Sequence, residues 1–381
     1  MRTIAREWGR LGVIGFGGPP AHIALLRRLC VDDRGWLSAR DFEDAIAATN
    51  LLPGPASTQL AIFCAWRLRG RLGAVVGGAC FILPGLVMIL ALSMLFLGGD
   101  PPLWVLGAAA GAGAAVPAVA VSAAVGLVRP SWTRAGTHNS ARLRWTLYLL
   151  AGGVAAATVG AVLVLVIATC GIVEFVARVR PPGGQSGHAH AAMLAIAPAG
   201  VATGGVAAVA WVALKVGALS YGGGFVIIPL MQHDAVNTHH WMTGTQFLNS
   251  VALGQVTPGP VVLTIAAVGY AAGGIAAGVF AAAIAFGPSF LYVIIGGPHF
   301  DRLRHSPQLQ AFLTGAGAAA IGAIGGAALP LTGSLGQPWQ VAVLAGAATW
   351  LLALRKGVVP ALLIAGAIGA VVVAAGAPLP A

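Results

Sequence analysis

Two stretches of this sequence interrupt apolar runs with Pro-Gly-Pro: Asn50-Leu51-Leu52-Pro53-Gly54-Pro55-Ala56-Ser57-Thr58-Gln59 and Gln255-Val256-Thr257-Pro258-Gly259-Pro260-Val261-Val262-Leu263-Thr264. A glycine motif precedes each, Phe16-Gly17-Gly18-Pro19 in the first half of the chain and Tyr221-Gly222-Gly223-Gly224 in the second. The offset between the copies is 205 residues for both motifs, so the alignment needs no gap. Doubled helix-breaking motifs in corresponding places predict two repeats with a ligand site at their interface.

The composition is that of a membrane protein. Of 381 residues, 58% are hydrophobic and 8% are charged, whereas a soluble domain carries about 25% charged residues. Charged residues this scarce cannot cover a soluble surface. The 55 glycines fit membrane helices that pack closely. We therefore predict an all-α, polytopic integral membrane protein.

The net charge of +11 comes mostly from short Arg clusters between apolar runs. Positive-inside topology accounts for the bulk of them, and an anion-attracting vestibule is the sharper alternative for a few. The loop 27–40 holds four Arg, while its counterpart 232–245 holds no Lys or Arg. This opposite bias predicts two inverted repeats with a cytoplasmic N-terminus. The predicted division is a repeat over 1–177, a linker over 178–190 and a second repeat over 191–381.

Capping signals place the helices around the breaks. Ser38 to Asp41 and Thr243 to Gln246 are capping boxes at corresponding positions, so helices should begin near residues 39 and 244. The pieces 41–52 and 56–66 are each too short to cross a bilayer, which needs about 20 residues. Because Arg clusters flank both, we predict a hairpin of two half-helices. One long kinked helix over 39–66 is the alternative.

Helix N-termini present free N–H groups and partial positive charge, which suits a small dianion. Four such starts would converge at mid-membrane, although glycine–proline breaks also occur as plain packing kinks. The candidate binding residues are Gly17, Gly18, Pro19, His22, Asn50, Pro53, Gly54, Pro55, Ser57, Thr58, Gln59, Tyr221, Gly222, Gly223, Gly224, Gln255, Thr257, Pro258, Gly259 and Pro260.

Titratable residues are sparse. Glu43 is the deepest candidate for a proton-coupling carboxylate, against helix capping as the plainer interpretation of the acidic residues near 41–44. His22 either titrates near an anion or is a hydrogen-bonded structural residue. Lys215 and Glu174 are weaker candidates, with snorkelling at a helix end as the alternative.

Other functional classes lack their signals. The four cysteines form no C-x-x-C pair, and no metal-ligand cluster, cofactor motif, Walker A loop or Ser/His/Asp arrangement is visible. Nucleic-acid binding has no basic module. A membrane-embedded enzyme or scaffold is the weaker alternative to a transporter.

The first glycine motif with Ala21-His22-Ile23, the first break with Ser57-Thr58-Gln59, and Gln255 to Pro260 together resemble the chromate ion transporter family, in its two-domain type. The resemblance covers nearly the whole chain. Tyr221 departs from it, since a Phe is expected there.

The resemblance implies secondary active export of chromate across the bacterial cytoplasmic membrane, conferring resistance. It makes sulfate a related or competing oxyanion, and a sulfate or other oxyanion transporter is the alternative function. A proton as coupling ion and a homodimer are left open.

Overall fold

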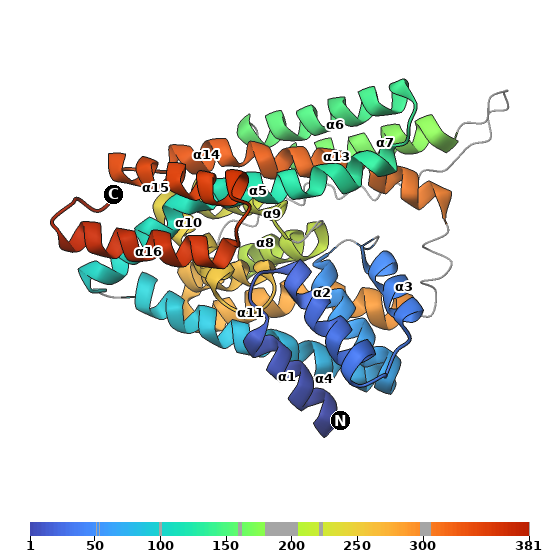
Figure 1. Cartoon of the computed structure of the whole chain (residues 1–381). Helices are drawn as coiled ribbons and strands as arrows, with labels where there is room; N and C mark the ends of the chain where they lie inside the picture. Colours follow the sequence, from blue (N-terminus) through green and yellow to red (C-terminus); the bar gives the residue numbers. More distant parts are fainter. Residues whose placement is uncertain are drawn as a thin grey trace.

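The computed structural model describes residues 1–50, 52, 54–98, 101–158, 162–179, 205–220, 224–297 and 306–380, and this part of the chain is helical without strands (Figure 1). The helices of the first half are α1 (Arg2–Ile14), α2 (Pro19–Arg27), the π-helix η1 (Arg28–Asp33), α3 (Ala39–Thr49), α4 (Ala56–Leu97), α5 (Leu103–Ala135), α6 (Asn139–Thr158) and α7 (Leu163–Val179). Those of the second half are α8 (Gly205–Leu219), α9 (Ile227–Gln232), the π-helix η3 (His233–Thr238), α10 (Gly244–Val256), the 3₁₀-helix η4 (Val261–Leu263), α11 (Thr264–Gly296), α13 (Pro307–Gly326), α14 (Ala328–Gly333), α15 (Pro338–Ala348), the π-helix η6 (Thr349–Ala353) and α16 (Val358–Ala374).

Helix boundaries follow the local chemistry. Gly17 and Gly18 adopt positive φ between α1 and α2, a conformation that costs glycine little. Ser38 accepts a hydrogen bond from the Asp41 N–H at the start of α3. Thr243 and Gln246 form the reciprocal capping box of α10. The predicted starts near residues 39 and 244 are therefore confirmed.

The first Pro-Gly-Pro turn lies at the tip of a helical hairpin. A straight helix over 39–66 would be roughly 40 Å long. Instead, Asp41 Oδ1 lies 3.9 Å from an Arg67 guanidinium nitrogen, so the chain returns to the level at which α3 begins. The backbone then leaves helical geometry at Arg69 and Gly70 inside α4. The predicted hairpin is confirmed, and the single kinked helix is wrong.

Backbone details recur at nearly constant spacing between the two halves. The π-helices η1 and η3 lie 205 residues apart, as do the positive-φ residues Gly54 and Gly259. His240, at φ 51°, takes the place of Gly35 at φ 58°. The break at Gly70 has its counterpart at Gly274, offset by 204.

The corresponding helices α4 and α11 run antiparallel to each other. Gly78 of α4 packs against the Phe290 ring of α11, whereas Leu90 of α4 packs against Gly278. The residue number therefore rises along one helix as it falls along the other.

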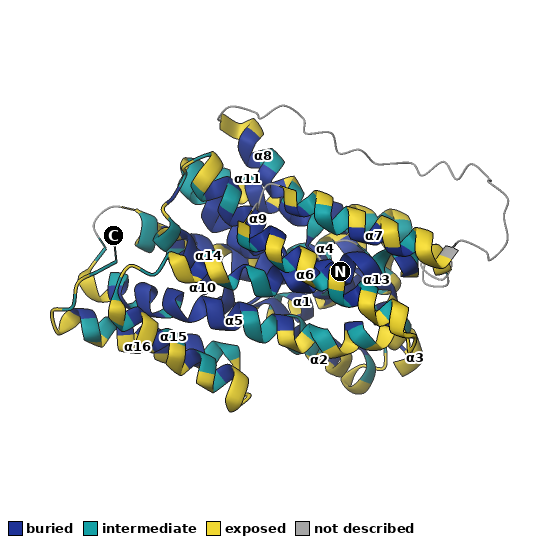
Figure 2. Ribbon diagram, turned by 90° about the horizontal axis from the view of Figure 1, so that it is seen from above, coloured by how far each residue is buried: buried dark blue, intermediate teal, exposed yellow. Residues whose placement is uncertain are grey.

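The outer surface of the helices is apolar. Four helical stretches, Ala56–Leu97, Leu103–Ala135, Val261–Gly296 and Pro307–Gly333, are long and apolar enough to cross a membrane. On α6, exposed apolar side chains recur with helical spacing at Leu143, Leu147, Leu150 and Val154. Exposed residues gather on the outer helices and buried ones at the centre (Figure 2). A polytopic membrane protein is the fold class that this arrangement defines.

The later helices of each half pack on the other half. α6 and α7 pack against α13, while α15 and α16 pack against α5, and Figure 1 shows these helices stacked side by side. Glycines permit both contacts: a Cβ on Gly322 would collide with the Leu149 carbonyl of α6, and one on Gly111 with the Ala365 carbonyl of α16. Small residues thus hold the two halves together, as is typical of membrane helices.

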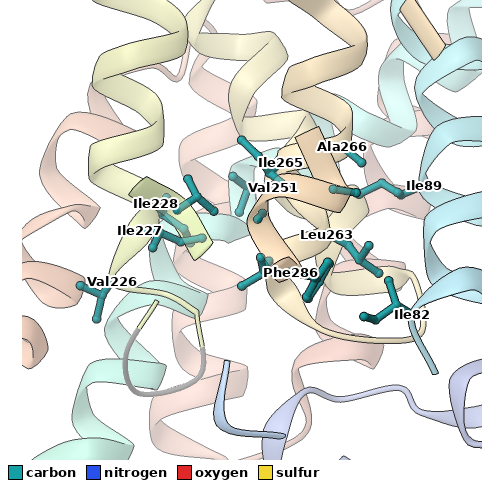
Figure 3. Packing of buried hydrophobic residues seen from close by; sticks show 14 of the residues in the cluster. Ile82, Ile89, Val226, Ile227, Ile228, Val251, Leu263, Ile265, Ala266 and Phe286 are labelled. Carbon is teal, nitrogen blue, oxygen red and sulfur yellow. The ribbon is translucent and has the colours of Figure 1, made fainter. Parts of the chain in front are cut away.

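The main hydrophobic core surrounds the second Pro-Gly-Pro turn. Leu263, directly after that turn, packs among buried residues of several helices, Ile82 and Ile89 of α4, Val251 of α10 and Phe286 of α11 (Figure 3). At the other end of the first half, α7 continues through Val179. The predicted linker therefore begins within a helix, and its remainder from 180 on lies outside the described residues.

Candidate functional site

A cavity of about 170 Å³ lies beside the first Pro-Gly-Pro turn. Its volume is more than ten times the about 10–15 Å³ that one water needs. Residues from four parts of the chain line it: Asn50, Leu52, Gly54 and Ala56 at the turn, Leu127, Pro130 and Arg134 near the end of α5, Ala320, Ile321 and Ile324 in α13, and Val226 just before α9. The cavity therefore joins the first break to the segment that follows the second glycine motif.

Arg134 is the charged residue that lines this cavity. It makes no ion pair with any described residue. Ala56, where α4 begins, also lines the cavity, and the first N–H groups of a helix have no partner within the helix. A guanidinium and a helix N-terminus facing one small cavity favour an anion.

Buried polar groups surround Gly54. Its φ of 121° excludes most side chains, and a Cβ there would lie 3.2 Å from Ser289 Oγ of α11 and would collide with the Gln59 amide. Thr58 Oγ1 and Ser289 Oγ are fully buried and make no hydrogen bond to any described residue. Buried hydroxyls without partners are uncommon and call for a ligand or water.

His22 connects three of the predicted motifs. Its Nε2 donates to the Gly15 carbonyl at 2.9 Å, and its Nδ1 accepts from the Ser57 hydroxyl at 3.1 Å. The Gly15 carbonyl also accepts from the Gly259 N–H at 2.9 Å. Both ring nitrogens are thus satisfied, which agrees with the structural alternative for His22. Ser57, in the same network, has a partner rather than a free hydroxyl.

The second Pro-Gly-Pro turn is closed by its neighbours. A Cβ on Gly85 of α4 would collide with the Pro258 carbonyl, so the two backbones touch. Gln255 Nε2 and Thr257 Oγ1 are buried without hydrogen bonds to the described residues, and like Thr58 and Ser289 they do not line the cavity described above.

The structure brings some predicted site residues together and leaves others apart. Asn50 and Gly54 line the cavity. Pro55 caps α4, and Thr58 and Gln59 follow it in the buried first turn. Gly17, Gly18 and Pro19 form the entry to α2, Gly224 packs on Val261 and Val262, and Pro260 precedes η4. Pro53, Tyr221, Gly222 and Gly223 lie outside the described residues.

The prediction that Glu43 is the deepest of the candidate carboxylates is wrong. Its side chain is 63% exposed and pairs with Arg27 at 3.4 Å. The reason is helix periodicity, because Phe42 and Ala45 turn toward the core and leave Glu43 on the outer face of α3.

Glu174 and Lys215, the two weaker candidates, belong to ionic clusters whose other members the sequence did not indicate. Glu174 is 2% exposed and is held by Arg144, Arg178 and Tyr148, so a snorkelling side chain at a helix end is wrong for it. The spacing of Glu174 and Arg178, four residues apart on one helix, is the signal that could have shown the pair. Lys215 and Asp234 form the second cluster, and no spacing connects residues so far apart.

These features define an α-helical, multi-pass membrane protein with broken helices around a buried polar region. The chain belongs to the chromate transporter family, because the model of that family, described as "Chromate transporter", matches residues 2–203 and again 207–373.

Curated relatives agree with this assignment. The chain is 32% identical over 339 residues to the "Chromate transport protein" of Cupriavidus metallidurans, a match that covers 87% of this chain and 82% of the relative. It is 32% identical over 341 residues to the protein of the same name in Pseudomonas aeruginosa, covering 84% and 79%. An uncharacterized transporter of Methanocaldococcus jannaschii is 26% identical, covering 78% and 76%. No solved structure matches the chain.

Proposed function

We propose that this protein is a secondary active transporter that exports chromate from the cytoplasm and thereby confers chromate resistance. The observation that carries the proposal is the cavity in which Arg134 faces the first Pro-Gly-Pro turn. A guanidinium there that makes no ion pair with the described residues, together with the start of α4, supplies positive charge for a tetrahedral dianion. The names of the relatives supply the substrate, and they are names of transport proteins rather than enzymes.

The proposed architecture is a pair of inverted repeats, with the N-terminus in the cytoplasm. The matching backbone breaks and the antiparallel course of α4 and α11 support it. Helices related by an axis in the membrane plane run in opposite directions, which is the arrangement that alternating access uses in several transporter folds. The Arg-rich loops of the first half support the orientation.

Sulfate is the alternative substrate, because the binding elements recognise charge and hydrogen-bond acceptors rather than the central atom. The test is accumulation of radiolabelled chromate, with and without excess sulfate, in cells that express the chain and in cells with an empty vector. Lower accumulation in expressing cells supports export. Unchanged chromate accumulation with altered sulfate content would mean that the site serves sulfate instead. No change in either anion would overturn the proposal.

Arg134→Gln tests the site itself. A hydrogen bond to a charged group contributes about 1.5–3 kcal/mol, so this change should weaken apparent chromate affinity about ten- to a hundredfold. Arg129→Gln is the matched control, since Arg129 lies on the same helix and is exposed like Arg134, but does not line the cavity. Equal effects of the two changes would mean that Arg134 acts only through general surface charge.

A further inference from the structure

An ion pair with a buried aspartate and a partly buried lysine joins two helical elements of the second half. Lys215 Nζ of α8 lies 2.6 Å from Asp234 Oδ2 of η3, and the side chains are 18% and 9% exposed. The ammonium also lies 5.6 Å from the centre of the Trp211 ring. Asp234 Oδ2 accepts no well-aligned hydrogen bond from the described residues. The two charged groups are therefore close together but are not joined by a well-aligned hydrogen bond.

Burying these two charges is costly. Removing a carboxylate and an ammonium from water costs several kcal/mol each, and their attraction offsets this only when the geometry is excellent. Lys215 lies within a helix whose other residues are apolar or aromatic. Ionisable residues in such segments are rare, and they usually belong to a transport or proton pathway.

The pair is connected to the cavity through one short segment. Val226 lines the cavity and directly precedes α9, and α9 continues into η3, where Asp234 lies. Eight residues of helix span roughly 12 Å. The π-helical turns at this end of the segment are a feature often found at functional positions. A shift of η3 relative to α8 would therefore reach the wall of the cavity.

The first half lacks this pair. The positions that correspond to Lys215 and Asp234 hold Arg10, which is exposed, and Leu29, which is buried. Its nearest equivalent is Glu7 with Arg34 at 2.7 Å, but the Arg34 side chain is 42% exposed. A role in charge movement would thus be confined to the second half.

We propose that Asp234 is the carboxylate that takes up the coupling proton, with Lys215 as its partner in the deprotonated state. The inference rests on the proposed function and assigns its coupling site. A proton added to the Asp234 carboxylate makes it neutral and removes its attraction to the Lys215 ammonium. The ammonium keeps its contact with the Trp211 ring. The α9–η3 segment is then free to move, and Val226 at the cavity moves with it.

Other titratable groups near the pair are few. The same segment carries His233, with His239 and His240 just beyond its end, and α11 carries Tyr270 and Tyr292. The described residues of α10 and α13, which also pack on this segment, include no charged or titratable side chain. Among the described residues of this region, Asp234 is thus the acidic group.

The experiment uses the purified full-length protein in proteoliposomes with radiolabelled chromate. One assay measures exchange at equal chromate and equal pH on both sides, and the other measures net flux under an imposed pH gradient. Asp234→Asn should keep exchange within about twofold of the wild type and lose the response of net flux to the gradient. Asp33→Asn, on the corresponding π-helix of the first half and exposed, should keep both.

A second variant covers the case in which an unpaired Lys215 prevents folding. The double variant Asp234→Asn with Lys215→Gln removes both charges and should insert, exchange and remain uncoupled. Loss of exchange in the double variant as well would overturn the inference, because the pair would then be needed for the fold itself.

The outcomes separate the two proposals. No chromate exchange by the wild type would refute the proposed function. Exchange by the wild type with no response to the pH gradient, or with a normal response in the Asp234 variants, would refute only the coupling site. Uncoupling by Glu43→Gln instead would return the role to the carboxylate of α3.

Discussion

The two Pro-Gly-Pro turns share a backbone conformation but differ in what packs against them. Gly54 and Gly259 both adopt positive φ, at 121° and 106°. Beside Gly54 lie a cavity, an arginine and the Ser289 hydroxyl. Beside Gly259 lie the Gly15 carbonyl and the Gly85 backbone. A duplicated motif thus fixes the turn, while residues from other helices decide whether the turn is open or closed.

α11 of the second half meets the first turn, and α4 of the first half meets the second turn. These two helices occupy corresponding positions in the two halves. Pro84 and Gly85 of α4 correspond to Pro288 and Ser289 of α11, 204 residues later. Gly85 lies against the turn of the second half, and Ser289 lies against the turn of the first half. The single difference, glycine against serine, gives one turn a backbone contact and the other a buried hydroxyl. The difference between the two turns can therefore be tested by substituting a few residues.

The largest effect is expected from a bulky residue at either turn. Gly54→Leu places a side chain at a φ that L-residues avoid and against Ser289 and Gln59. Chromate transport and binding should both fall to background. Gly259→Leu strains the positive φ and so displaces the backbone N–H that donates to the Gly15 carbonyl. Its Cβ would lie 3.1 Å from Leu263 Cδ1, which is flexible. It should abolish transport but leave binding measurable, because the open turn is intact.

Binding of radiolabelled chromate to the purified variants and transport in cells measure these two outcomes. Gly126→Leu is the control, since a Cβ on Gly126 of α5 meets no atom within 4 Å. Complete loss of binding in both turn variants, with all three proteins inserted, would show that the closed turn also holds the anion.

Smaller effects are expected at Gly85 and Ser289, where α4 and α11 differ. One substitution should mainly change stability and the other mainly chromate affinity. Gly85→Ala adds a methyl group against the Pro258 carbonyl and should destabilise the protein by about 1–3 kcal/mol. Ser289→Ala removes a buried hydroxyl that has no partner among the described residues, so stability should be unchanged or slightly higher, because an unsatisfied buried polar group is costly.

Chromate affinity should respond more to Ser289→Ala than to Gly85→Ala. Loss of a neutral hydrogen bond costs about 0.5–1.5 kcal/mol, so Ser289→Ala should weaken binding about two- to tenfold. Thermal unfolding in detergent and chromate binding give the two numbers. A stability loss at Ser289 with unchanged binding would assign its hydroxyl to the fold and remove it from the site.

The sequence predicts the parts of this molecule that local chemistry controls. Capping residues located α3 and α10, and the glycines and prolines located both turns. The repeat spacing also extends to features that no motif marks, such as the π-helices. These successes share a cause, because each depends on residues within one or two helical turns.

What the sequence did not predict depends on distant partners. Arg134 follows Gly54 by 80 positions, and only the packing of α5 beside the first turn brings it to the cavity. In the sequence it is one of many arginines in clusters between apolar runs. The depth of Glu174 likewise depends on the course of α6 and α13. Burial set by the contact of whole helices is not visible in a local pattern.

The smallest effect is expected at the helix caps, where the two halves differ by one bond. Thr243 and Gln246 satisfy two backbone N–H groups between them. Ser38 satisfies one, and its own hydroxyl donates to the Asp41 carboxylate at 2.7 Å. Losing an N-cap costs about 1 kcal/mol, so Thr243→Ala and Ser38→Ala should each speed hydrogen exchange in the first turn of α10 or α3.

Thr243→Ala should have the larger effect of the two, because the remaining bond from the residue 243 N–H to Gln246 Oε1 loses the reciprocal bond that completes the capping box. At Ser38, the ion pair of Asp41 with Arg67 remains after the change, although an exposed pair contributes only about 0–1 kcal/mol. A larger effect at Ser38 would therefore mean that the Ser38–Asp41 bond orients the carboxylate toward Arg67. The hairpin around the open turn would then be closed from its base by a cap and an ion pair acting together, a coupling that the second half, with no charged residue in α10, cannot have.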